Sequence, residues 1–398
     1  MIALLVAGAL LAAGAVYWLG LVQRNVHLWL PHYVRRRRVL RRAPPPPGLR
    51  HVLFFFVDHF EPLAGKADEA RGLARVERWV NAYATVASRH RDGNGRTPVH
   101  TFFYPEEEYR PALVEPIAAL CRRGFGEIEV HLHHDGDTDA ELRRKLERFL
   151  ETLHRNHGAI SRDETGYRWA FIHGNWALDN SRPDGRWCGV NNELVVLRET
   201  GCYADFTFPS APSDTQPRTV NSIYYATDDP DRPKSHDRGV PMRVGGSPQG
   251  DLLIFQGPLA PNWRRRRMGI WPRIENADIA PSVVPIEERV DLWVREHIHV
   301  RGRPEWIFVK VHTHGAIERN ADHLFGGELE RLWTCLEERY NDGVRFKLHY
   351  VTAREAYNIA RAAEAGREGD PSLYRDFVIP PPSWMPADAR GESGAGIS

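Results

Sequence analysis

Short apolar runs alternate with amphipathic stretches along the chain from residue 51 onward. The first run, VLFFFV at residues 52–57, is apolar without interruption, as expected for a strand buried on both faces. Further strands are expected at residues 99–104, 127–133, 169–173, 204–208, 222–226, 252–256, 306–312 and 346–351. Apolar residues at helical spacing predict helices at residues 69–89, 111–123, 139–154, 192–200, 286–297 and 324–340. This strand–helix order predicts an α/β fold whose parallel sheet is closed or nearly closed as a barrel.

The first 22 residues are almost entirely apolar and carry no charged side chain. At about 1.5 Å per residue, a helix of this length spans roughly 33 Å, which is enough to cross the core of a bilayer. Tyr17 and Trp18 lie near one end of the run, where amphipathic rings prefer the membrane interface. A cleaved signal peptide is the alternative, but no Lys or Arg precedes the run and the run is long for that role. The sequence therefore predicts one N-terminal transmembrane helix.

Positive charge is concentrated next to this apolar segment. Residues 23–50 contain eight arginines and no acidic residue, which leaves 45 basic and 52 acidic residues in the rest of the chain. The positive-inside rule then predicts an inner-membrane protein whose body lies on the cytoplasmic face, with the arginines against anionic headgroups. The mildly acidic body argues against binding to nucleic acid. The expected organisation is a transmembrane anchor at 1–22, a basic juxtamembrane segment and Pro linker at 23–50, the barrel at 51–378 and a disordered tail at 379–398.

Composition narrows the class of protein further. With 42% hydrophobic and 26% charged residues in 398, the chain can form an ordinary globular core, which excludes global disorder. The four cysteines lie far apart and form no CxxC pair. This spacing excludes a disulfide scaffold and a Cys-rich zinc site, and it suits a reducing compartment.

Polar residues gather where the predicted strands end, and parallel α/β folds place their sites at these carboxyl ends. The strand at residues 127–133 ends in HLHHD, and residues i and i+2 of a strand share a face, so His131 and His133 point the same way. Two imidazoles about 6–7 Å apart can converge on one metal ion, and the neighbouring DGDTD could add a ligand or an orienting carboxylate. The alternative is a solvated His-rich strand end, or histidines satisfied within the core.

Two other strand ends carry groups suited to acid–base chemistry. Beside a metal, Asp58 can be a ligand or the general base that activates a water molecule, and otherwise it would cap the following turn. His59 follows it directly. His312 and His314 are again an i and i+2 pair; one could donate a proton to a leaving group, or both could be ordinary polar filling of the barrel mouth.

The stretch FIHGNWALDNSRPDGRWCG contains a third group of candidates. His173 and Asn175 could donate hydrogen bonds to a developing oxyanion, although the Gly- and Asn-rich stretch could equally be a tight structural loop. The sequence has no Walker-type glycine loop and no GxSxG motif, so these features do not suggest phosphate cradling or a serine nucleophile.

The strand ending in Asp58-His59, the strand ending in HLHHD and the late strand ending in HTHG together resemble the glycoside hydrolase/deacetylase superfamily, in particular the polysaccharide deacetylases of carbohydrate esterase family 4. The likeness extends over residues 51–361. It implies a distorted (β/α)7-type barrel and a divalent metal, with zinc as the expected ion, held by one Asp and two His. It also implies that Asp58 is the general base and that a late-strand histidine, assigned as His314, is the general acid.

The resemblance also suggests the metal ligands and the substrate. His59 stands where the family has its metal-binding Asp, and His131 matches the first metal-binding His. The second is replaced by His133, His134 or Asp135, and we assign it to His133. His173, Asn175 and His312 are assigned to substrate binding from their places at the strand ends, because the stretch around His173 has no counterpart in the family's motifs.

The expected function is that of a membrane-anchored, metal-dependent hydrolase that removes acetyl groups from a saccharide, such as a lipid-linked intermediate of envelope or exopolysaccharide assembly. Two alternatives stay open. A glycoside hydrolase of the same superfamily would need a second carboxylate, and Asp58 with Glu61, Asp135 or Asp205 could supply the pair. A non-catalytic saccharide-binding or scaffold subunit of a polysaccharide synthesis complex would need neither metal nor acid–base groups.

Overall fold

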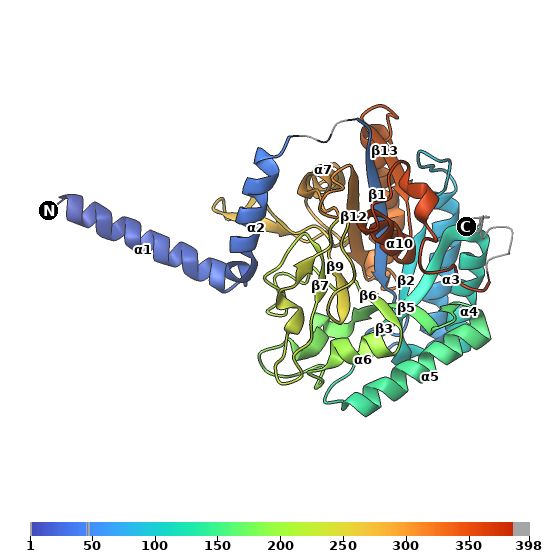
Figure 1. Ribbon diagram of the computed structural model, residues 1–398. Helices are drawn as coiled ribbons and strands as arrows, with labels where there is room; N and C mark the ends of the chain where they lie inside the picture. Colours follow the sequence, from blue (N-terminus) through green and yellow to red (C-terminus); the bar gives the residue numbers. More distant parts are fainter. Residues whose placement is uncertain (1, 45, 47, 385–398) are drawn as a thin grey trace.

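The computed structural model describes residues 2–44, 46 and 48–384. Its centre is a large, mostly parallel sheet in which the strands follow the order β12-β1-β2-β3-β5-β6-β9-β7-β8, with β13 also paired to β1 and β4 to β5 (Figure 1). The strands of this sheet are β1 (Arg50–His59), β2 (His100–Pro105), β3 (Gly126–Leu132), β4 (Ser161–Asp163), β5 (Gly166–His173), β6 (Cys202–Asp205), β7 (Ile223–Ala226), β8 (Val240–Pro241), β9 (Leu252–Phe255), β12 (Trp306–Thr313) and β13 (Phe346–Tyr350). A separate antiparallel pair consists of β10 (Ala260–Arg267) and β11 (Trp271–Glu275). The predicted α/β class is confirmed.

The sheet curls until its two ends approach each other. Between β8 and β12, single bridges join Arg243 to Arg301 and Ile298 to Phe308, so residues 298–301 span the gap between these strands. Rings from distant strands meet inside the curl: the centroid of Phe255 lies 5.5 Å from that of Phe55 on β1 and 5.3 Å from that of Phe308 on β12. The curled sheet therefore has an interior face and an outer face.

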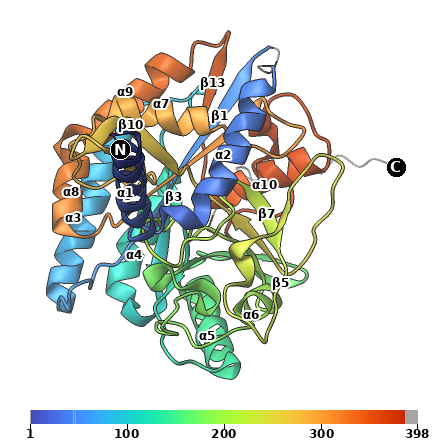
Figure 2. The ribbon, with the colours of Figure 1, turned by 90° about the vertical axis from the view of Figure 1, so that its left-hand side faces the viewer.

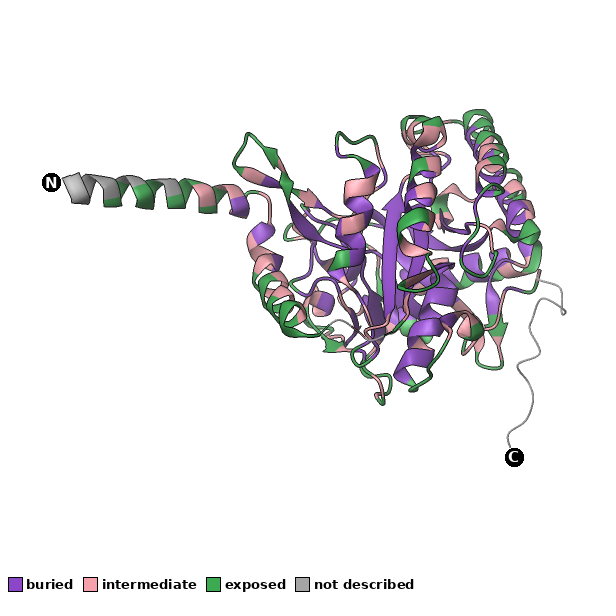
Figure 3. Ribbon diagram, turned by 90° about the horizontal axis from the view of Figure 1, so that it is seen from above, coloured by how far each residue is buried: buried purple, intermediate pink, exposed green. Residues whose placement is uncertain are grey.

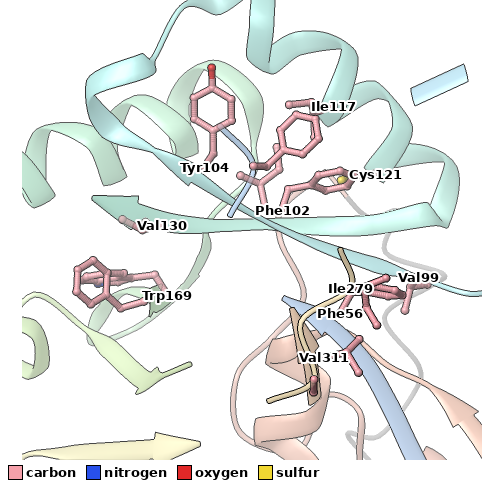
Figure 4. Close-up of a cluster of buried hydrophobic side chains, with 14 of the residues drawn as sticks. Phe56, Val99, Phe102, Tyr104, Ile117, Cys121, Val130, Trp169, Ile279 and Val311 are labelled. Carbon is pink, nitrogen blue, oxygen red and sulfur yellow. The ribbon is translucent and has the colours of Figure 1, made fainter. Parts of the chain in front are cut away.

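Each central strand contributes alternate side chains to the two faces, as the period of two requires. On β1, Leu53, Phe55 and Val57 belong to the apolar layer inside the curl, whereas Phe54 and Phe56 belong to the apolar layer on the outer face. Both sets are buried: the outer set lies under helices (Figure 3), and the interior set packs within the curl. Figure 4 shows part of the apolar layer on the outer face.

The helices of the body divide between these two layers. Most supply apolar residues to the apolar layer on the outer face, whereas α10 supplies its apolar residues to the layer inside the curl. The helices are α3 (Glu69–Ala87), α4 (Pro111–Leu120), α5 (Asp139–His157), α6 (Glu193–Glu199), α7 (Ile286–Glu296), α8 (Glu318–His323), α9 (Leu329–Tyr340) and α10 (Ala353–Glu364). A capping box starts α10, in which Thr352 accepts from the backbone of Glu355 and the Glu355 side chain accepts from Thr352. The buried ion pair of Arg354 with Glu127, at the start of β3, holds α10 where the strands begin. The carboxyl ends of the strands are thus left for a site.

Two helices precede the sheet, α1 (Ile2–Val22) and α2 (Val26–Arg42) (Figures 1 and 2). Among the described residues, no helix combines the length and the apolar character needed to cross a membrane. The predictions of a transmembrane helix and of a single-pass inner-membrane protein are therefore wrong.

The basic segment packs against the body of the protein. Trp29 on α2 is fully buried, and Arg36 donates to the carbonyl oxygen of His297 at 2.9 Å. The carboxylate of Glu296 lies 3.8 Å from Arg36 and 3.9 Å from Arg37, so α2 uses part of its positive charge within the protein. Of the predicted tail at 379–398, Ile379 is buried and residues 385–398 lie outside the described part of the chain.

Candidate metal centre

Three strand ends bring histidines together on the interior side of the curled sheet. His59 ends β1, His131 lies near the end of β3, and His314 directly follows β12. The ring of His59 lies 5.0 Å from that of His131, edge to face, and 4.6 Å from that of His314, on which it stacks at 23°. β12 pairs with β1, and only β2 separates β1 from β3, so the parallel strands bring the three imidazoles to the same edge of the sheet.

A carboxylate completes this group. Glu61, two residues after His59, places Oε1 3.2 Å from Nε2 of His131. His59, Glu61 and His131 are all buried, and each offers a ligand atom within 4.8 Å of the others. We call these three residues the mouth cluster.

The hydrogen bonds of His131 fix which ring nitrogen faces the mouth cluster. Its Nδ1 lies 2.7 Å from the carbonyl oxygen of Ile172, which can only accept, so Nδ1 carries a proton. Nε2 then points at Glu61. Unless His131 takes a second proton, two acceptors face each other there, and a bound cation would resolve that conflict. A backbone carbonyl behind an imidazole is also a usual way to orient a metal-binding histidine.

The electrostatics of the mouth cluster suit a cation. Burial lowers the pKa of His59 well below its usual value, and the neighbouring imidazoles lower it further, so this ring is neutral and has a free lone pair. Burial alone would raise the pKa of Glu61, but a doubly protonated His131 outweighs it through its hydrogen bond and charge and holds this pKa at about 2. A bound cation would supply that positive charge in place of the second proton. Two imidazoles and an ionised carboxylate are common zinc ligands. The residues of the mouth cluster therefore fit a divalent metal.

His133 stands at the edge of the same group. Its Nδ1 lies 2.5 Å from Oε1 of Glu107, and its Nε2 lies 3.7 Å from Oε1 of Glu61. Burial opposes protonation of His133, but the bond to Glu107 outweighs it and raises the pKa of this imidazole. A cavity of about 430 Å³, lined in part by Glu107, Tyr109 and Arg148, borders this dyad.

His312 and Asp278 lie beside His314 on the interior side. His312 is buried, with its ring 6.2 Å from that of His59. A parallel bridge sets Asp278 against His312, and burial raises the pKa of Asp278 while His314 offsets part of that shift. The half-buried ring of Trp176 lies 6.4 Å from His59 and 6.3 Å from His314.

Asp58 is not part of this group. Because it precedes His59 on the strand, its side chain lies on the outer face, where it is fully buried. Its carboxylate accepts from the backbone N–H of Gly315 at 2.7 Å and lies 2.9 Å from Nε2 of His100. A Cβ at position 315 would lie 2.2 Å from Oδ2 of Asp58, so the contact needs a glycine there. The structure thus ties Asp58 to the turn after His314 and separates it from the mouth cluster.

His173 and Asn175 are also placed apart from the mouth cluster. His173 is fully buried on the outer side, with its ring 4.7 Å from that of His134, near Cys188 and Glu193. Asn175 is half-buried at the start of the following loop, with a φ of 54°. Neither the oxyanion role of His173 nor that of Asn175 gains support from these positions.

Several residues of the site were missed or only partly recognised. Glu61 was considered only as a glycosidase carboxylate, although its i+2 spacing from His59 could have placed it on the same side. Asp278 and Glu193 follow no motif, and only the folded chain brings them to histidines more than 30 residues away. Trp176 belongs to no recognisable motif, since a lone tryptophan in a loop has many ordinary roles.

No protein-family model and no curated protein matches the chain. Among solved structures, a candidate glycoside hydrolase/deacetylase from Parabacteroides distasonis matches with a TM-score of 0.41 and 13% identity, over 81% of this chain and 73% of that one. A GH57 branching enzyme from the hyperthermophilic archaeon Thermococcus kodakaraensis, solved with glucose, matches with a TM-score of 0.36 and 10% identity, over 75% and 69% of the two chains. Both TM-scores are below 0.5.

Proposed function

We propose that this chain is a metal-dependent hydrolase that removes acetyl groups from a saccharide, built on a distorted (β/α)7-type barrel. The mouth cluster carries this proposal. It combines a buried neutral imidazole, a histidine whose second nitrogen is already engaged, and an ionised carboxylate at the carboxyl ends of parallel strands. The choice of an acetyl group as the acyl group removed and of a saccharide as the substrate rests on the motif resemblance.

In this proposal His59, Glu61 and His131 hold a divalent metal, with zinc as the expected ion. Bound there, such a metal is a Lewis acid that polarises a carbonyl oxygen and lowers the pKa of water. His133 lies close enough to Glu61 to serve as a further ligand, and Glu107 fixes its orientation. These residues assign the ligands without Asp58.

Proton transfer falls to Asp278 and His314. A general base works best when its pKa lies near the working pH, and burial shifts the pKa of Asp278 in that direction. Its Oδ1 has no hydrogen-bond partner among the described residues and is free to accept a proton. His314, half-buried over His59, is the donor to the leaving amine or alcohol. Asp58 is a positioning residue, because it holds the backbone directly after His314.

Aromatic and polar groups around the mouth cluster suit a sugar. The face of a tryptophan is a common platform for a sugar ring, and Trp176 lies beside both His59 and His314. The cavity next to Glu107 offers Tyr109 and Arg148 to a longer saccharide. His312 is placed to contact the reacting group from the sheet side.

The test is acetate release from N- and O-acetylated oligosaccharides by the purified chain, with metal analysis of the same sample. We expect about one zinc at the mouth cluster and acetate release that is lost together with that zinc in His131→Ala. His154→Ala is the matched control, since this histidine is on α5, where its Nδ1 contacts the carbonyl oxygen of Ile160 and its ring lies 5.4 Å from that of Tyr167, outside the mouth cluster. Acetate release that is unchanged in His131→Ala would contradict the proposal.

A glycoside hydrolase is the second candidate, favoured by one observation. Glu61 and Asp278 have pKa values shifted in opposite directions, a pattern that separates an ionised carboxylate from a proton-donating acid. The other carboxylates considered for this role are engaged elsewhere: Asp135 accepts from the backbone of Trp187, and Asp205 accepts from Thr207. New reducing ends without acetate would establish the glycosidase, and binding of saccharide without either product would establish a scaffold.

A further inference from the structure

A second group of metal-ligating side chains lies on the outer side of the same strand ends. It is formed at the ends of β3 and β5, in the loop after β5, and at the start of α6. We call it the outer cluster, and its members are His134, His173, Cys188 and Glu193. All four are buried, and each offers a ligand atom within 4.8 Å of the others.

The carboxylate of Glu193 joins the other three members. Its Oε1 lies 3.2 Å from Nε2 of His134 and 3.5 Å from Nε2 of His173. Its Oε2 lies 3.4 Å from Sγ of Cys188. In tetrahedral zinc sites with Zn–N near 2.1 Å and Zn–S near 2.3 Å, neighbouring ligand atoms are about 3.4–3.8 Å apart. The outer cluster therefore has the spacing of a four-coordinate site.

Both histidines direct Nε2 into the cluster, because Nδ1 of each ring faces an oxygen atom on the opposite side of the ring. Nδ1 of His173 lies 2.5 Å from the carbonyl oxygen of Gly174, which can only accept, so Nδ1 carries the proton. Its Nε2 is buried and has no hydrogen-bond partner within the described ranges. A buried lone pair aimed at a carboxylate is unfavourable, and a cation between them removes the conflict.

His134 has the other usual arrangement of a zinc-bound histidine. Its Nδ1 lies 3.4 Å from Oδ2 of Asp137, an electrostatic contact without the geometry of a hydrogen bond. Asp137 is held in turn by the ammonium group of Lys145, at 2.7 and 2.8 Å. Carboxylates behind metal-binding histidines orient the ring in this manner.

We propose that the outer cluster binds a structural zinc ion. One carboxylate and one thiolate balance the charge of a divalent ion bound by two neutral imidazoles, which suits a site without water. Binding releases the proton of the Cys188 thiol. Four protein ligands leave no position for substrate, so this ion has a structural role distinct from that of the mouth cluster.

The ion would fix a loop that serves the mouth cluster. Residues 174–192 join β5 to α6, and they contain Trp176, the proposed sugar platform. Several non-glycine residues of this loop adopt left-handed conformations, including Trp176 at φ 56° and Asp179 at φ 55°. Such conformations persist where the surroundings determine them, and a metal between the end of β3 and the start of α6 provides that constraint.

Sulfur coordination distinguishes the two sites, because the mouth cluster has only nitrogen and oxygen donors. X-ray absorption at the zinc edge of the full-length chain should show a sulfur neighbour at about 2.3 Å. The cobalt-substituted protein should show a sulfur-to-metal charge-transfer band. Bound zinc without a sulfur neighbour, or no bound metal after supplementation, would overturn the proposal. This measurement needs no variant and does not depend on acetate release.

Variants then assign the sulfur. Cys188→Ala should lose one zinc per chain together with the sulfur signal, and Cys202→Ala, at another buried thiol, should lose neither. In His131→Ala, the remaining zinc should keep its sulfur neighbour. An unchanged zinc content in folded Cys188→Ala would refute the assignment. If the mouth cluster binds no metal, the wild type will hold one sulfur-bound zinc, so failure of the proposed function is distinguishable from failure of this inference.

Discussion

Replacing Asp58 by Asn separates a positioning role from a catalytic one. The asparagine keeps an oxygen for the N–H of Gly315, which Asp58 contacts at 2.7 Å, and loses the negative charge. Hydrogen bonds to charged groups contribute about 1.5–3 kcal/mol and neutral ones about 0.5–1.5 kcal/mol, a difference of about 1 kcal/mol for each bond. The amide nitrogen of the asparagine then faces Nε2 of His100, 2.9 Å from the present carboxylate, and can donate to it once the imidazole proton moves to Nδ1; with both bonds neutral, the free energy of unfolding should fall by about 2 kcal/mol.

The catalytic consequence of this change should be small. If Asp58 acts only through the turn after His314, Asp58→Asn should keep its zinc and its pH profile and lose about tenfold in kcat, or about 1.4 kcal/mol in the barrier. Removal of a general base usually costs about 10²–10⁴-fold. Asp58→Ala is the structural comparison, since it leaves two buried donors unpaired and should lose about 4 kcal/mol of stability.

Urea unfolding, zinc content and the pH dependence of acetate release measure these effects on the same preparations. A folded, zinc-loaded Asp58→Asn protein whose kcat falls by about a thousandfold, with one limb of the pH profile missing, would show that Asp58 is the base after all. In that case the outer-face position of its side chain would not represent the working enzyme, and our separation of Asp58 from the mouth cluster would be refuted.

Three further changes test the electrostatics of the interior and of the mouth. Burial raises the pKa of Glu129 from 4.5 to about 8, so the folded state keeps a proton that the unfolded state releases, and the stability that this group contributes falls as the pH rises between these values. Measured by urea unfolding, the free energy of unfolding of Glu129→Gln relative to wild type should therefore rise by about 2.5 kcal/mol from about pH 5 to pH 7. A difference that stays constant with pH would contradict the shift. Arg354→Ala leaves the buried carboxylate of Glu127 unpaired and should lower the free energy of unfolding by about 3–5 kcal/mol, against a loss below about 1 kcal/mol if the pair is dispensable. Glu107→Gln removes the charge that orients His133 and should weaken metal binding by about 10–100-fold in a chelator competition, whereas unchanged affinity would exclude His133 from the metal site.

The sequence predicted the strands of the sheet well because their apolar runs are uninterrupted. Because these runs are apolar throughout, the sequence does not show which side chains at the strand ends face the interior of the sheet and which face outward. In β1 both faces are buried, so no polar alternation shows which of Asp58 and His59 points inward. The motif resemblance suggested Asp58 as a base, and only the folded sheet shows its carboxylate bonded to Gly315 on the outer face.

Within the site, contacts set by local spacing could be predicted from the sequence, whereas contacts between distant residues could not. The i and i+2 rule placed His131 and His133 on one side, where both reach Glu61. It could not pair His134 with Glu193, because 59 positions separate them and their contact depends on the path of an irregular loop. The prediction for the N-terminal segment was wrong for another reason. The sequence predicts its arginines against lipid headgroups, but in the fold α2 packs on the body through a buried tryptophan, and its arginines lie near an acidic partner, Glu296, far along the chain.

The end of β3 has a consequence for how this protein can change. His133 and His134 are adjacent, yet one contacts Glu61 at the mouth and the other contacts Glu193 behind the sheet. A single insertion or deletion just before them would reverse both directions at once, and each imidazole would be presented to the wrong partners. Substitutions can therefore alter either group alone, but changes of length at this point cannot, and a lineage that kept both groups would be expected to hold the segment from β3 to His134 at constant length.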